Sequence, residues 1–76
     1  MNTKKLNSLY SKLEGILGDM VMIHDKAQTA YDNKSDKWKG SEAGELEYTR
    51  ITELESAMSE LESAMSSLDN AKVEDD

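Results

Sequence analysis

Carboxylates are the most abundant chemically active side chains of this chain, and they recur with a fixed period in its second half. The heptad Glu-Leu-Glu-Ser-Ala-Met-Ser fills residues 53–59 and is repeated without change at residues 60–66. Its glutamates are Glu53, Glu55, Glu60 and Glu62. No Lys or Arg occurs between residues 51 and 71. A row of negative charge of this kind is suited to contacting a basic protein surface.

Catalytic and metal-binding patterns are missing from the sequence. His24 is the only histidine, so neither a cluster of histidines around a metal nor a nucleophile supported by a second histidine can form. Asp32 and Asp36 have the spacing of two calcium-loop ligands, but Lys37 replaces the turn glycine and Ala43 the bidentate glutamate. We therefore predict no enzymatic activity, no catalytic residue, no metal site and no cofactor.

The charge of the chain is divided unevenly along its length. The 76 residues carry a net charge of -7. Residues 1–39 contribute +2 and residues 40–76 contribute -9. Because the acidic half would be repelled by nucleic acids and by anionic membranes, we expect neither to be bound directly.

Size and composition predict one small domain that covers residues 1–76. The chain has no cysteine, which fits a reducing compartment, and its longest apolar run, Met20–Ile23, is too short for a membrane span. We expect a cytoplasmic protein. A chain this short buries only about 60% of the surface of its unfolded form, so we also expect it to need a partner subunit.

Apolar residues in the first half follow three heptad columns, which predict a helix over residues 3–31. The first column is Leu6, Leu13, Met20 and Ala27. The second is Leu9, Ile16, Ile23 and Ala30. The third, which widens the apolar stripe, is Tyr10, Leu17, His24 and Tyr31. A stripe three columns wide suits a helical bundle better than a two-stranded coiled coil.

The second half predicts another helix, over residues 41–71. Residues 32–41 are rich in turn-forming residues and are expected to form a linker, and Ser41 is expected to cap the second helix. Residues 72–76 are expected to be a frayed tail. Ala57, Ala64 and Ala71 flank the apolar positions of this helix and would allow close approach of another helix.

Together these elements predict an all-α fold, an antiparallel helical hairpin that dimerises into a four-helix bundle. The residues expected to form its core and dimer seam are Leu13, Ile16, Met20, Ile23, Ile51, Leu54, Met58, Leu61, Met65 and Leu68. A homodimer is expected because a lone hairpin would leave half of each stripe in water.

Two single residues allow alternative interpretations. Trp38, the only tryptophan, is either a plug over the open end of the bundle or an anchor for a partner protein. His24 is either a half-buried, hydrogen-bonded side chain or a pH-sensitive contact. The lysines around Trp38 are expected to be solvated or paired with acids of the second helix.

Residues 30–71 resemble a group of very small acidic proteins encoded by bacteriophages and mobile elements. The shared segments are Tyr31-Asp32-Asn33, Ser41-Glu42, Gly44-Glu45, Leu54-Glu55-Ser56-Ala57 and Leu61-Glu62-Ser63-Ala64. The chain departs from the group at Lys34-Ser35, where Leu-Pro is frequent. Trp38-Lys39-Gly40, between the two helices, also resembles the motif of the WXG family, whose members are helical hairpins exported by type VII secretion. The chain lacks the C-terminal export signal of that family.

The resemblance and the charge pattern together predict a phage or mobile-element accessory protein that binds a host protein and modulates or inhibits it. A host protein with a basic groove that handles nucleic acid or acts in defence would suit the acidic surface, through Glu53, Glu55, Glu60 and Glu62. The alternatives are a scaffold that only forms bundles, with a solvated acidic surface, and a WXG-like secreted dimer.

Overall fold

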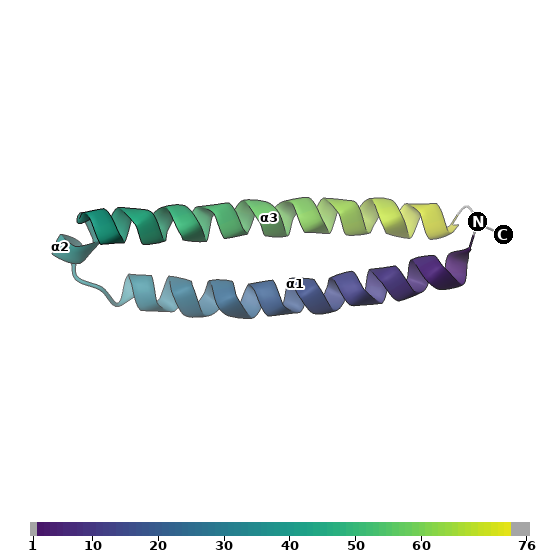
Figure 1. The fold of residues 1–76 in the computed structure, drawn as a ribbon, viewed down its shortest axis with the longest axis horizontal. Helices are drawn as coiled ribbons and strands as arrows, with labels where there is room; N and C mark the ends of the chain where they lie inside the picture. The colour runs from purple at the N-terminus through teal and green to yellow at the C-terminus, as the bar shows by residue number, and fades with distance from the viewer. Residues whose placement is uncertain (1, 74–76) are drawn as a thin grey trace.

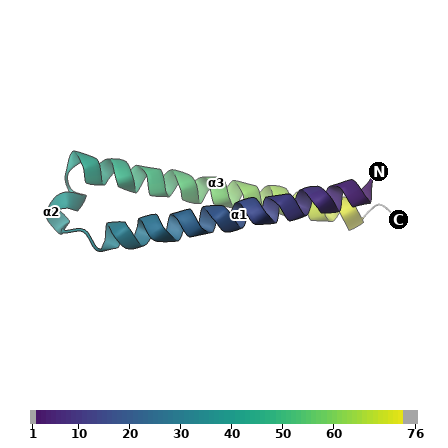
Figure 2. The ribbon, with the colours of Figure 1, turned by 60° about the horizontal axis from the view of Figure 1, so that its bottom comes forward.

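The computed structural model describes residues 2–73, which form three helices. They are α1 (Thr3–Asp32), α2 (Asp36–Lys39) and α3 (Glu42–Val73). Figure 1 shows α1 and α3 side by side and antiparallel, with α2 at one end of the hairpin and the start of α1 beside the end of α3 at the other. Figure 2 shows that the two long helices cross at a shallow angle. The predicted all-α hairpin is confirmed.

Local capping contacts set the start and end of α1. The Asn2 side chain accepts a hydrogen bond from the Lys5 backbone N–H at 3.0 Å, which satisfies a donor that the first turn leaves unpaired. At the other end the Asn33 N–H donates to the carbonyl of Thr29. The helix therefore starts where the sequence predicts and continues one residue further.

The predicted linker, residues 32–41, is only partly irregular, because it contains the single-turn helix α2. Ser35 caps this turn by accepting a hydrogen bond from the Trp38 N–H at 3.2 Å. Asp36 lies in the first turn and Lys39 in the last, as the helix dipole favours. Residues 2–73 thus form three helices where the sequence predicts two.

α3 begins as predicted and ends later than predicted. The Ser41 hydroxyl accepts from the Gly44 N–H at 3.2 Å, which confirms Ser41 as the cap. The prediction of a frayed tail was wrong for Lys72, which is helical. Its Nζ lies 3.2 Å from Oδ1 of Asp69 and 4.2 Å from the centre of the Tyr10 ring, and these contacts favour the extra turn. Residues 74–76 of the predicted tail lie outside the described residues.

The core is thin. Among residues 2–72 only two apolar side chains are buried, Ile51 at 5% exposure and Met65 at 7%. The radius of gyration of 17.1 Å exceeds the roughly 11 Å expected for a compact chain of this length. An extended hairpin therefore gives each helix one neighbour and leaves the remainder of its surface in water.

The contact between the long helices uses two of the three apolar columns of α1. The first and third columns are mostly half-buried against α3, and Leu13 and Met20 lie there as predicted. The second column faces solvent: Leu9 is 41% exposed, Ile16 50% and Ile23 61%. Ile16 and Ile23 therefore take no part in the hairpin core. On α3 the remaining predicted seam residues are buried or half-buried: Ile51, Leu54, Met58, Leu61, Met65 and Leu68.

Candidate protein-interaction surfaces

His24 joins the two long helices through a polar contact. Its Nε2 lies 2.8 Å from Oε2 of Glu55 on α3, and its Nδ1 lies 3.3 Å from Oδ1 of Asp25. The His24 side chain is 16% exposed, whereas that of Glu55 is 53% exposed. The prediction that His24 is half-buried and hydrogen-bonded is confirmed. Glu55 is consequently not a free carboxylate.

The carboxylates of Glu55 and Asp25 also favour the charged form of His24. Both ring nitrogens face acceptors, and only the imidazolium form donates from both nitrogens at once. The hydrogen bond to Glu55, and after it the one to Asp25, raises the pKa of His24 above its ordinary value. Partial burial opposes this rise but does not cancel it.

The four glutamates of the repeat lie on two sides of α3 and do not form a single face. Residues two apart on a helix point about 160° away from each other, because each residue turns the chain by about 100°. Glu55 and Glu62 lie on the side of α3 that carries the contact with His24, and Glu62 lines a hollow there with Tyr10. Glu53 and Glu60 lie on the opposite side. All four are exposed, as predicted.

Trp38 closes the α2 end of the hairpin without being fully buried. Its ring meets that of Tyr31 edge-on, with 6.1 Å between the centroids, and Tyr31 lies 6.0 Å from Tyr48 of α3. Trp38 also lines a hollow together with Tyr31 and Glu47. These contacts are those expected of a plug. Part of the Trp38 ring remains exposed, and its role as an anchor for a partner protein stays a prediction.

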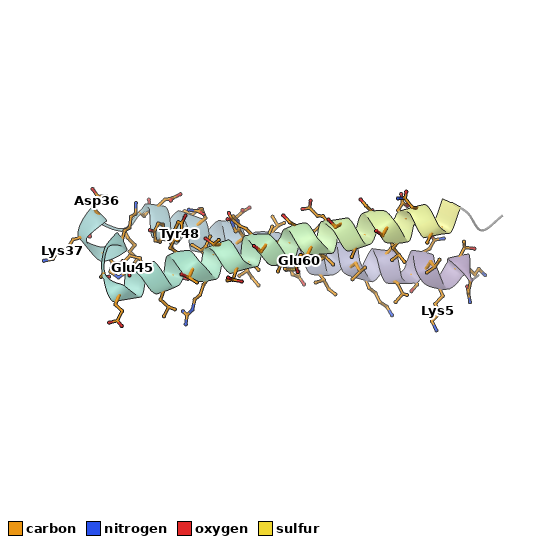
Figure 3. All side chains as sticks on the ribbon, turned by 90° about the horizontal axis from the view of Figure 1, so that it is seen from above. Lys5, Asp36, Lys37, Glu45, Tyr48 and Glu60 are labelled. Atoms are coloured by element: carbon orange, nitrogen blue, oxygen red, sulfur yellow. The ribbon has the colours of Figure 1, made fainter. Side chains whose placement is uncertain are left out.

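Two lysines near Trp38 lie over aromatic rings. Lys34 Nζ is 5.1 Å from the centre of the Trp38 ring, and Lys39 Nζ is 5.4 Å from that of Tyr31. Both are cation–π contacts. The sequence analysis instead predicts that these lysines are solvated or paired with acids of the second helix. Figure 3 shows Asp36 and Lys37 pointing outward from α2 at the tip of the hairpin.

Gly44 is a structural requirement that the sequence analysis missed. A Cβ at this position would overlap the carbonyl oxygen of Trp38 and lie 2.7 Å from Cα of Lys39. α2 can therefore fold back onto the start of α3 only because residue 44 has no side chain. A glycine three residues after the helix cap, where propensity alone disfavours it, was the available signal.

The described residues contain no cluster of potential metal ligands and no membrane-spanning helix. Within residues 2–73, no three His, Asp or Glu side chains gather closely enough to hold a metal ion. None of the helices there has a stretch long and apolar enough to cross a bilayer. What the described surface presents is exposed carboxylates, exposed aliphatic side chains and an aromatic cluster at one end.

Comparisons of this chain with protein-family models, with curated proteins and with solved structures returned no match. The function therefore has to be argued from the chemistry of the surface.

Proposed function

We propose that this chain is a protein-interaction module. In this proposal it self-associates into a four-helix bundle and binds a partner protein with a basic surface through the acidic residues of α3. The partner is a host protein that handles nucleic acid or acts in defence, and binding modulates or inhibits it. The chain itself is then a phage or mobile-element accessory protein.

The observation that carries this proposal is the unbalanced charge of α3. Residues 51–71 include no Lys or Arg, and Glu53, Glu60 and Glu62 are exposed along this stretch. Solvated helices usually place a basic residue one turn from each acid, which neutralises it. α3 instead leaves its carboxylates available to cations supplied by another molecule.

The spacing of these carboxylates supports a basic groove as the binding site. Within each column the glutamates recur every seven residues, about 10 Å along the helix, and the two columns alternate. DNA presents a phosphate about every 3.4 Å per strand, so one column carries roughly a third of the charge density of a strand, which a groove lined by Lys and Arg can accommodate. A dimer would carry twice as many carboxylates.

The test is affinity capture from a host lysate followed by mass spectrometry. Two variants separate the columns: Glu53→Gln with Glu60→Gln, and Glu55→Gln with Glu62→Gln. We expect wild type to capture a basic protein at low salt, and at least one variant to capture it at least tenfold less. Capture should also fall steeply with added salt, because exposed charge pairs are screened over about 8 Å at physiological ionic strength. Equal capture by all three proteins at low and high salt would contradict the proposal.

A scaffold that only forms bundles is the second candidate. It is favoured by the exposed aliphatic column of α1, since Ile16 and Ile23 offer more apolar surface than an isolated hairpin needs. Self-association with no captured protein under any salt condition would select this candidate.

A further inference from the structure

One open side of the hairpin is apolar across both long helices. We call this side the aliphatic face. It consists of Leu9, Ile16 and Ile23 of α1 and Ala57, Ala64 and Ala71 of α3. Ile23 lines a hollow with Arg50 and Leu54, so the exposed column of α1 lies on the same side as Arg50. The three alanines follow Arg50 at heptad intervals and so continue its column along α3. The contact between His24 and Glu55 lies on the other side.

The hairpin exposes more surface than a compact monomer of its mass. It exposes 5672 Å², roughly 1,000 Å² more than the area expected for a folded monomer of its mass. The aliphatic face spans about 21 Å along the helices and is two helices wide, which gives about 400 Å² per copy. A stable interface buries about 800 Å² per partner, so this face would supply about half of such an interface and its rim the other half.

The shape of the aliphatic face is complementary to itself. The contacts between His24 and Glu55, and between Tyr31 and Tyr48, show which residues of α1 and α3 lie at the same level along the hairpin. Heptad counting from these pairs places Ile23 level with Ala57, Ile16 with Ala64 and Leu9 with Ala71, within one residue. Each large side chain of α1 therefore has a small one of α3 at its level.

Two arrangements of a symmetric pair follow from this face. With the twofold axis parallel to the helices, α1 of one copy lies on α3 of the other, and each Ile or Leu meets an Ala. With the axis perpendicular to the helices, α1 lies on α1 and α3 on α3, so large side chains meet each other and alanines face alanines across a gap. Facing large and small residues pack without strain or voids, which favours the first arrangement.

Charge at the rim of the face does not distinguish the two arrangements. The column beyond the face on α1 carries three lysines and Asp19, and that on α3 two glutamates, all of them exposed. The lysines and glutamates are Lys5, Lys12, Lys26, Glu53 and Glu60, and Lys5 projects away from the hairpin in Figure 3. In the first arrangement Lys26 of one copy is level with Glu53 of the other, and Asp19 is level with Glu60. In the second, centred on Ile16, Lys12 faces Asp19 and Lys5 faces Lys26, so each arrangement has one opposite-charge and one like-charge pair. The sizes of the facing side chains are therefore what favours the first arrangement.

We propose that a second copy of this chain covers the aliphatic face, with α1 of each copy lying on α3 of the other. The inference rests on the proposed self-association and adds the surface and the orientation. Under it, Glu53 and Glu60 form part of the dimer rim. Glu55 and Glu62 remain on the side that faces away from the second copy.

Cysteine cross-linking tests the orientation cleanly, because the chain has no cysteine of its own. Ile16→Cys and Ala64→Cys are oxidised separately and after being unfolded and refolded together as an equimolar mixture. A disulfide needs Cα atoms within about 7 Å, so only facing positions react efficiently. We expect the mixture to form at least tenfold more disulfide-linked dimer than either variant alone. Gly15→Cys mixed with Ser63→Cys, both exposed and outside the face, gives the background of random oxidation.

Three outcomes overturn the inference, and they differ in what they mean for the proposed function. If Ile16→Cys alone cross-links as well as the mixture, the chain self-associates in the other orientation. If unmodified chain sediments as a monomer at a concentration on the order of 100 μM, self-association fails together with this inference. Cross-linking of the mixture at only the background level also contradicts it.

Discussion

Two residues take their roles from contacts between different helices. The imidazole of His24 links α1 to α3 through Glu55, and Gly44 allows α2 to lie against the first turn of α3. His24 is the one ionisable member of an otherwise apolar and aromatic column, and Gly44 belongs to none of the apolar columns. Each nevertheless affects the stability of the hairpin in a way that a single substitution can measure.

The first prediction concerns pH. Since folding raises the pKa of His24, the folded state holds its proton to higher pH than the unfolded state does. The contribution of His24 to the free energy of unfolding is then fully present below the ordinary histidine pKa and is lost as pH rises through the raised value. Urea unfolding from about pH 5.5 to 8.5, at one protein concentration, should show this loss in wild type and not in His24→Gln. Parallel curves for the two proteins would show that the contact with Glu55 is not formed.

The second prediction concerns glycines in different surroundings. Gly44→Ala should lower the free energy of unfolding, because overpacking against the Trp38 carbonyl costs about 1–3 kcal/mol. Gly15→Ala should raise it by up to about 1 kcal/mol, since its Cβ would meet open space and alanine is the better helix former. Thermal or urea unfolding of both variants measures the difference. A Gly44→Ala chain as stable as the Gly15→Ala chain would contradict the placement of α2.

At the scale of elements, α1 and α3 are amphipathic in different ways. α1 has apolar residues on a wide stripe and turns only part of it toward α3. Beyond the exposed Leu46 and Tyr48 near its start, α3 uses its large apolar residues for that contact and places alanines beside it. The short helix α2 joins them and brings Trp38 against Tyr31. The pairing of a wide stripe with a narrow one leaves the exposed aliphatic column.

The third prediction compares a buried with an exposed side chain of similar size. Ile51→Ala should lower the free energy of unfolding by about 2–5 kcal/mol, because Ile51 is 5% exposed and its removal leaves a cavity between the helices. Met22→Ala should change it by less than about 0.5 kcal/mol, since Met22 is 63% exposed. Urea unfolding checks both values. Equal effects would place the contact between the helices on different columns.

At the scale of the whole molecule, the hairpin is long and narrow, with principal extents of 58, 15 and 12 Å. A body with these proportions has little interior, and its stability must come from a long contact between two helices. Burial of the aliphatic face by a second copy would add a second contact of similar length. Stability would then depend on how much of the chain is paired.

The fourth prediction is that stability depends on concentration. If pairing supplies part of the free energy, dilution by a factor of about 100 should lower the melting temperature by roughly 5–10 °C through mass action. Melting followed by far-ultraviolet circular dichroism at two concentrations measures this shift. The Ala64→Glu variant, which places a charge on the face without touching the hairpin contact, should melt at a lower temperature than wild type. An unchanged melting temperature on dilution would argue for a monomer.

The sequence by itself determined the two long helices and their ends to within two residues, because heptad spacing and capping are local properties, but it did not predict α2. Ser41 could be named as a cap, and Glu53 to Glu62 as exposed, from nearby residues alone. The opposite directions of Glu53 and Glu55 also follow from helix geometry, although our sequence analysis treated them as one face.

Only the tertiary structure decided which residues of each helix meet. Any two neighbouring apolar columns of α1 could have faced α3. In the structure the columns of Leu13 and Leu17 do so, and the column of Ile16 faces solvent. The contact between His24 and Glu55 and the position of Lys72 over Tyr10 depend on the level at which the helices pair. That level is set by contacts across the whole hairpin, so no local pattern specifies it.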